Sequence, residues 1–233
     1  DIFDKYSRFP CLESVSPVRQ GMGTSDNARF LRLPWEVHCS AIFLGSAGAV
    51  IDWRTLSYAP YIKGAAGAVW IEPLSDIIEW KGNGLAVKTL NERLYGSYSR
   101  KVKNEDWFFR PGVAFSPVGN SFTARAHRFA SICDDMGTSV YPDDIGQALS
   151  LLNTSFASEV IGSLNPTLHF NAGDVNRLPS VPVFTASRVY ETLGAAFSKR
   201  ELRREPSVEF NSPGPSPWRH AQAWAQTAVD RPE

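Results

Sequence analysis

The feature that most constrains the fold is a change in the spacing of apolar residues at Asp143. Between residues 104 and 141, short apolar and aromatic runs are separated by Pro-Gly and Gly-Asn turns, a pattern typical of several short strands. From Ile145 to Ile161, apolar residues recur every three or four positions, which indicates an amphipathic helix over residues 144–164. The change predicts an α+β fold, in which a twisted, mostly antiparallel sheet from residues 21–142 is closed by that helix.

Clusters of proline and glycine mark boundaries that divide the chain into three parts. Residues 1–20 contain two prolines and are expected to be a linker outside the core, and residues 21–184 form the main domain. Residues 185–233 form a helical and Pro-rich extension, with a helix expected from Thr185 to Glu205 and a short one around Trp218 to Val229. Because no closing element follows, we expect the natural polypeptide to continue.

Composition excludes several classes of protein. No stretch approaches the roughly 18 consecutive apolar residues that a membrane span needs, and the first nine residues are charged where a signal peptide would be apolar. We therefore expect a cytoplasmic protein with no membrane partner. Cysteines and histidines are scattered, without CxxC or metal-ligand spacing, so we expect no metal site among Cys11, Cys39, Cys133, His38, His127, His169 and His220.

Motifs for catalysis and cofactor binding are absent from the sequence. No GxGxxG or GxxxxGK[ST] loop occurs, and residues 119–123 (GNSFT) do not match the GxSxG turn of hydrolases. Residues 142–144 (PDD) begin like a nuclease motif, but no carboxylate-x-Lys triplet follows, and capping of the next helix explains the acidic pair better. Residues 165–168 (NPTL) depart from the Asn-Pro-Pro-aromatic motif of amino-methyltransferases. We therefore expect no catalytic residue and no cofactor in this chain.

The basic charge is concentrated in the middle of the chain. Overall, 24 Lys and Arg balance 24 Asp and Glu, but residues 81–128 carry nine basic and three acidic side chains, a net charge of +6. Such a local excess attracts phosphates, although a solvated basic face remains an alternative. The side chains expected to contact DNA are Lys63, Lys81, Arg100, Lys101, Lys103, Arg110, Asn120, Ser121, Thr123, Arg125, His127 and Arg128.

Residues 121–128 are the candidate base-reading segment. If they form a strand, Ser121, Thr123 and Arg125 share one face and Arg128 lies on the other. Arginine can read guanine through two hydrogen bonds in the major groove. The alternatives are an ordinary polar sheet surface and, for Arg125, a buried structural arginine paired with Asp134 or Asp135.

Several motifs resemble one family of DNA-modifying enzymes. Residues 20–30 (QGMGTSDNARF) resemble the Gly-x-x-Thr-x-x-Asn-x-x-Phe turn that follows the catalytic domain in many adenine-specific DNA methyltransferases. Residues 104–116 (NEDWFFRPGVAFS), 119–129 (GNSFTARAHRF) and 149–179 follow in the order seen in PglX-like methyltransferases of BREX phage-defence systems. Fused type II restriction-modification enzymes show the same layout more loosely. Residues 22–27 (MGTSDN) depart from the usual Thr-Gly-Asp-Asn turn.

This resemblance implies a target-recognition domain for double-stranded DNA at residues 21–184. S-adenosylmethionine would bind in an upstream methyltransferase domain that is absent from this chain, to which residues 1–20 would be the linker. The turn expected near the target base consists of Gly21, Thr24, Asn27 and Phe30. The alternative is a protein-interaction scaffold that docks other BREX proteins through the Pro-rich tail.

Overall fold

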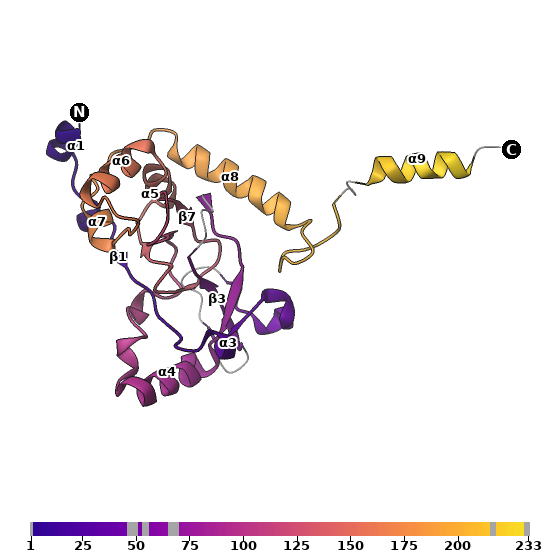
Figure 1. Ribbon diagram of the computed structural model, residues 1–233, viewed down its shortest axis with the longest axis horizontal. Coiled ribbons are helices and arrows are strands. Elements are labelled where there is room, and N and C mark those ends of the chain that lie inside the picture. Colours follow the sequence, from indigo (N-terminus) through magenta and orange to yellow (C-terminus); the bar gives the residue numbers. More distant parts are fainter. Residues whose placement is uncertain (1, 46–50, 53–55, 65–69, 215–217, 231–233) are drawn as a thin grey trace.

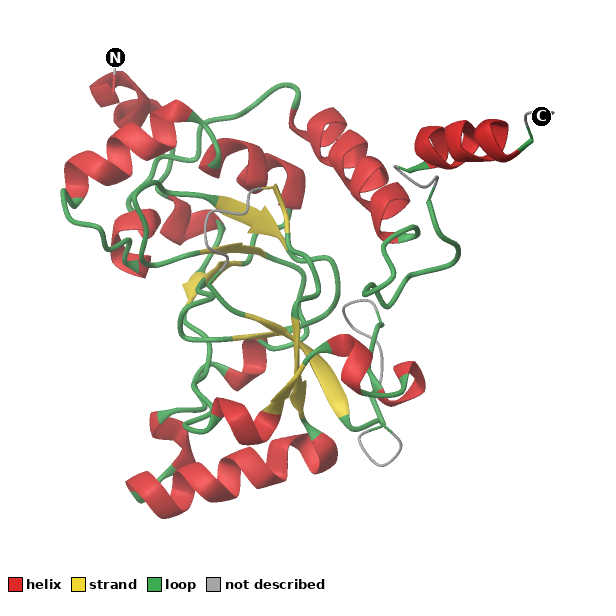
Figure 2. Ribbon diagram, turned by 45° about the vertical axis from the view of Figure 1, so that its right-hand side comes forward, coloured by secondary structure: helices red, strands yellow, loops and turns green. Residues whose placement is uncertain are grey.

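A computed structural model describes residues 2–45, 51–52, 56–64, 70–214 and 218–230. Their strands form two small, mostly antiparallel sheets, and helices pack around both (Figure 2). The α+β class is therefore confirmed, with two sheets in place of the one expected over residues 21–142.

The first sheet contains five strands in the order β1-β9-β6-β7-β4. Neighbours are antiparallel except β4, which pairs in parallel with β7. The strands are β1 (Val18–Arg19), β4 (Trp70–Ile71), β6 (Val113–Phe115), β7 (Ala124–Ala126) and β9 (Ser139–Val140).

Helices from both ends of the chain cover the first sheet (Figure 1). Helix α5 contacts β6 and β7, and α8 packs on α5. Leu149 and Leu152 of α5 are fully buried against Phe115 and Phe122, so the apolar stripe seen in the sequence does face the core. The helices are α1 (Ile2–Arg8), α2 (Leu12–Val15), α5 (Ile145–Leu152), α6 (Ser155–Leu164), α7 (Ala172–Asn176) and α8 (Ala186–Glu201).

The second sheet has the order β2-β5-β3-β8 and a core of its own. Its strands are antiparallel except β8, which pairs in parallel with β3. Trp80 is fully buried in this core, edge-on to Phe108 at 5.8 Å between ring centres. The elements of this part are β2 (Leu31–Arg32), β3 (Tyr58–Ile62), β5 (Asp76–Glu79), β8 (Ile132–Cys133), α3 (Asn27–Phe30), α4 (Lys81–Tyr95), η1 (Pro34–Glu36), η2 (Cys39–Ala41), η3 (Tyr98–Arg100) and η4 (Glu105–Trp107).

The helix expected over residues 144–164 is interrupted, and the break has a visible cause. The side-chain amide of Asn153 accepts the N–H of Ala124 at 3.1 Å and donates to the Ala124 carbonyl at 2.9 Å, so it serves β7 instead of continuing the helix. Thr154 then caps α6 by accepting a backbone N–H at 3.1 Å. Asp144 caps α5, as the sequence analysis expected.

The N-terminal segment from Leu12 to Val18 does not lie outside the core. Leu12 and Val18 are buried in the core of the first sheet, where Val18 pairs with Val140. The expectation of a linker outside the core is therefore wrong for this segment, because two prolines do not prevent short helices and an edge strand. Helices α4 and α7 also lie where the sequence predicts only strands and extended chain.

The two helices expected in the extension are confirmed as α8 and α9 (Arg219–Val229). Figure 1 shows α9 projecting away from the rest of the molecule. Within the ranges that the structure describes, no helix is both long and apolar enough to cross a membrane.

Candidate nucleic-acid interface

The turn expected near the target base is built by a close backbone approach. A Cβ atom on Gly21 would lie 1.9 Å from the carbonyl oxygen of Cys133, so only glycine fits there. The Met22 N–H donates to the same carbonyl at 2.8 Å, and Phe30 is buried in the core of the second sheet. Gly21 and Phe30 therefore have structural roles, which fix the position of the residues between them.

Thr24 and Asn27 hold the shape of the turn. The Thr24 hydroxyl donates to the side-chain carbonyl of Asn27 and accepts the Asp26 N–H at 3.2 Å. Asp26 caps α3 by accepting the Arg29 N–H at 3.1 Å. Thr24 is buried, whereas Asn27 is exposed and available to a ligand.

The surface beside this turn is hollowed, with a volume of about 590 Å³. We call this the turn hollow; its lining includes Thr24, Asn27, Lys63, Tyr95, Lys101, Asp134 and Asp135. Burial raises the pKa of Asp134 to about 7, and its hydrogen bond with Asp135 adds to the rise. The turn hollow thus combines lysines with a carboxyl pair that can donate as well as accept hydrogen bonds.

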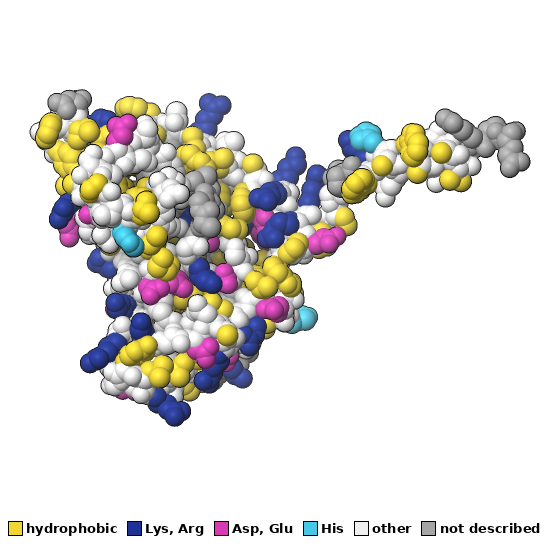
Figure 3. Space-filling view, in the orientation of Figure 1, with side chains coloured by type: hydrophobic (Ala, Val, Ile, Leu, Met, Phe, Trp, Pro, Cys, Tyr) yellow, Lys and Arg dark blue, Asp and Glu magenta, His cyan; other side chains and the backbone are white. Residues whose placement is uncertain are grey.

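Basic side chains gather on the part of the molecule formed by α4, η3 and the segment up to residue 110, which we call the basic lobe. Dark-blue side chains surround the α4 end of the molecule in Figure 3. Six are half-buried or exposed, and none of them forms an ion pair with any residue that the structure describes: Lys81, Arg93, Arg100, Lys101, Lys103 and Arg110. Lys88 differs, because it pairs with Glu105.

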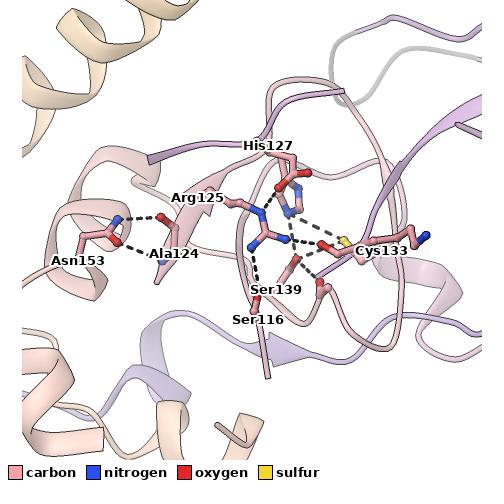
Figure 4. Close-up of polar contacts among 10 residues, drawn as sticks. Ser116, Ala124, Arg125, His127, Cys133, Ser139 and Asn153 are labelled. Atoms are coloured by element: carbon pink, nitrogen blue, oxygen red, sulfur yellow. Dashed lines mark hydrogen bonds and ion pairs between the residues drawn. The ribbon is translucent and has the colours of Figure 1, made fainter. Parts of the chain in front are cut away.

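Arg125 does not lie on a DNA-accessible face. It is fully buried in β7, where its guanidinium forms an ion pair with Glu72 and donates to the Lys63 carbonyl and the Ser116 hydroxyl (Figure 4). Burial raises the pKa of Glu72 to about 7, and the Arg125 charge opposes that rise. Base reading by Arg125 is therefore wrong, and the alternative of a buried structural arginine holds with Glu72 as its partner instead of Asp134 or Asp135.

His127 and Arg128 are also engaged inside the protein. The His127 ring lies 3.0 Å from the Ser139 hydroxyl and 3.3 Å from the Arg110 carbonyl, and burial lowers its pKa to about 4 (Figure 4). Arg128 is nearly buried, pairs with Glu209 and donates to Ser198 at 3.3 Å. Neither side chain is available to DNA, because both follow β7 into the interior and bind partners within the protein.

Three of the polar residues expected to read bases lie near the opposite end of β7. Asn120 and Ser121 are exposed in a loop, and Thr123 is half-buried. This loop is held by Gly119, whose N–H donates to the Leu168 carbonyl at 3.1 Å, so it joins the α6–α7 region and not the basic lobe. The structure therefore separates the expected phosphate contacts from the expected base contacts.

Sequence reasoning missed three residues that hold the site together. Glu72 and Glu209 pair with Arg125 and Arg128 across 53 and 81 residues of chain, and Asn153 bonds β7 across 29. Partners so far apart leave no local signal. The exposure of Arg93 on α4 could have been found once α4 is recognised, because Val87 and Asn91 mark its inner face and Arg93, two positions further on, falls on the opposite face.

Comparison with known proteins identifies a relative. No protein-family model matches the chain. Over 194 residues, however, the chain is 28% identical to "Adenine-specific methyltransferase PglX" of Lacticaseibacillus casei (strain Zhang). The chain is a distant homologue of part of PglX. The match covers 82% of this chain and 16% of that protein, so the chain spans only a small part of the length of PglX. The resemblance seen in the sequence is thus confirmed as distant homology.

Within the parts of the chain that the structure describes, no group of three or more His, Cys, Asp and Glu side chains could hold a metal ion. Cys133 is buried beside Ser139 and Tyr141, and burial raises the pKa of its thiol to about 11. A thiol that stays protonated at neutral pH is a poor nucleophile.

Proposed function

We propose that this chain is the double-stranded DNA recognition module of an adenine-specific DNA methyltransferase in a phage-defence or restriction-modification system. Residues 21–184 would be the recognition domain, supported by the N-terminal residues that complete its first sheet, and residues 185–233 an extension. S-adenosylmethionine and the target adenine would bind in a separate methyltransferase domain.

The observation that carries this proposal is the basic lobe. Its six cationic side chains are free to contact phosphates, since none is neutralised by an ion pair in the described structure. Lys63 adds a seventh cation beside the turn hollow, although its ammonium lies 3.7 Å from the Asp76 carboxylate. Phosphate contacts fix the position of a protein on the duplex and supply most of its non-specific affinity. Homology to part of an adenine-specific methyltransferase supports the same assignment.

Fluorescence anisotropy of the 233-residue chain on duplex DNA across a salt series tests this function. If about five cations contact phosphates, log K should fall with log salt at a slope near −4 to −5. The double variant Lys101→Ala/Lys103→Ala should reduce the slope by about two, because two contacts are lost. The matched control Arg188→Ala/Lys199→Ala, on the exposed face of α8, should leave the slope unchanged.

A DNA interface on the basic lobe would be contradicted by binding that does not depend on salt. It would also be contradicted if the two double variants reduced the salt slope equally. The chain should transfer no methyl group by itself, which a methylation assay with S-adenosylmethionine checks. Measured methylation by the chain would show that it contains catalytic residues of its own.

A second candidate function is protein docking within a defence complex. The observation in its favour is α9, which projects from the molecule and exposes 73% of Trp224 and 79% of Val229 (Figure 1). If this extension serves only docking, a chain ending at residue 205 should bind DNA with the affinity and salt slope of the full chain.

A further inference from the structure

Helix α4 turns one face to the core and the opposite face to solvent. Val87 and Asn91 are fully buried on the inner face. Asn91 accepts the Ser25 hydroxyl at 2.7 Å, and this bond to a distant segment, together with the burial of both side chains, fixes the rotation of the helix about its axis. The outer face of α4 therefore has one fixed orientation relative to the core.

Three outer residues at four-residue spacing form a stripe along α4. Leu85 is 66% exposed, and Thr89 and Arg93 are also exposed. Side chains four positions apart lie one above the other on a helix, so the three can touch the same partner. Leu85, Thr89 and Arg93 all face solvent and therefore contribute nothing to the core.

The stripe forms one wall of a hollow of about 480 Å³. Its other lining residues include Arg29 of α3 and Lys81 at the start of α4, and Glu79 is the one acidic side chain among the described lining residues. Positive charge thus stands at both ends of the stripe, whereas Leu85 and Thr89 leave its middle uncharged. Arg29, Lys81 and Arg93 make no ion pair with any residue in the described ranges.

This arrangement matches what a helix needs inside the major groove of DNA. The groove is about 12 Å wide and admits an α-helix, with phosphates on both sides and base edges at its floor. The regular turns of α4 run from Leu85 to Tyr95, about 16 Å, which is long enough to face four or five base pairs. Cations at the ends can meet phosphates while uncharged and bidentate side chains meet bases.

We propose that α4 is the base-reading element, with Thr89 and Arg93 contacting base edges, Leu85 contacting a thymine methyl group, and Arg29 and Lys81 contacting phosphates. This inference rests on the proposed function. It assigns sequence specificity to α4 instead of to Arg125 and its neighbours. Arginine reads guanine through two hydrogen bonds, so Arg93 would specify one guanine.

Selection of duplexes from a random library by the full 233-residue chain, followed by anisotropy on the selected sequence, tests the inference. Arg93→Ala should lower affinity for that sequence about 10- to 100-fold and remove the preference for guanine at one position. Thr89→Ala should weaken the base preference at a neighbouring position of the selected DNA sequence. Affinity for random duplexes should fall much less. The matched controls Arg188→Ala and Thr192→Ala, on the exposed face of α8, should select the wild-type sequence.

The two possible failures can be told apart. If the wild-type chain selects no sequence and binds no duplex, the proposed function is wrong and the inference falls with it. If the wild-type chain selects a sequence that Thr89→Ala and Arg93→Ala select unchanged, the function stands and α4 is not the reader. Because all four substitutions are on exposed sites, a thermal melt of each variant should match the wild type and rule out misfolding as the cause.

Discussion

At the scale of single residues, Arg125 shows why a polar side chain in a basic segment need not contact DNA. Its position in sequence is indistinguishable from that of a surface arginine, since the neighbours Thr123, His127 and Arg128 are all polar. What decides its role is Glu72, which β4 brings beside it through the parallel pairing of Trp70 with Arg125. A buried ion pair of this kind is costly to break from one side, because the remaining charge stays without a partner.

We therefore expect Arg125→Met to lower the free energy of unfolding by about 3–5 kcal/mol at pH 8. The pKa of Glu72 is already about 7 beside Arg125, and loss of the arginine should raise it further. Glu72 is then protonated in the folded variant at pH 6, so the loss should be smaller there. Urea unfolding at both pH values measures this.

The double variant Arg125→Met/Glu72→Leu is the control, because it removes both charges. It should recover most of the lost stability, as replacement of a whole buried pair is often tolerated. A double variant no more stable than the single one would show that the guanidinium acts mainly through the Lys63 carbonyl and Ser116.

His127 gives a pH-dependent prediction with a defined sign. Burial lowers its pKa to about 4 in the folded protein, below the ordinary value of 6.5, so the unfolded chain binds the extra proton between these values. The stability contribution of a neutral His127 is therefore complete above pH 6.5 and is lost as the pH falls toward 4, by about 2 kcal/mol at pH 5. In His127→Gln this loss should vanish.

Urea unfolding of both proteins at pH 7.5 and pH 5 isolates the histidine. Glu72 and Asp134 have raised pKa values and act in the opposite direction, but they are present in both proteins and cancel in the comparison. A stability difference between wild type and variant that is the same at both pH values would contradict a buried, neutral His127.

At the scale of elements, the sequence predicts what depends on local spacing. Helices α8 and α9 were predicted because their patterns are continuous, and Asp144 was predicted as a cap because it directly precedes α5. The break between α5 and α6 was not predicted, because its cause is the hydrogen bonding of Asn153 to Ala124 in a distant strand. Helix α4 was missed since Gly82 and Gly84 interrupt its beginning.

These two glycines give a matched pair of substitutions. Both have a left-handed backbone, with φ of +61° at Gly82 and +73° at Gly84. A Cβ on Gly82 would meet little, so Gly82→Ala should cost about 1–2 kcal/mol through backbone strain alone. A Cβ on Gly84 would lie 2.7 Å from the ring of Trp80, so Gly84→Ala should cost a further 1–3 kcal/mol through overpacking.

Thermal or urea unfolding of the two variants measures the difference. Equal losses of stability in Gly82→Ala and Gly84→Ala would mean that the Trp80 ring moves aside without a cost in free energy. Since Trp80 fills the core of the second sheet and its ring nitrogen donates to Asn83 at 3.2 Å, we expect the ring to resist. The start of α4 is thereby tied to the core, which keeps its outer face in place.

At the scale of the whole molecule, two sheets with separate cores meet at a small cluster of Ile62, Ala114 and Cys133, and Arg128 helps to hold the C-terminal extension to them. This side chain stacks on Phe197 of α8, donates to Ser198 and pairs with Glu209 beyond the helix. No sequence pattern predicts these contacts, because Arg128 is about 70 to 80 residues from its partners Ser198 and Glu209.

Arg128→Met should therefore loosen the segment after α8 while leaving both cores folded. Loss of the ion pair leaves Glu209 without its cation, and loss of the bond to Ser198 removes a second anchor, so amides from residue 202 to 214 should exchange with solvent faster and proteases should cut there first. Exchange in β6 and β7 should change little, since their pairing is independent of Glu209.

The control is Arg203→Ala, which changes an exposed arginine in the same segment and should leave amide exchange as in the wild type. If Arg128→Met left the exchange of residues 202–214 unchanged, the packing of α8 on α5 would be sufficient to hold the extension, and the role of Arg128 would be limited to filling space beside Phe197.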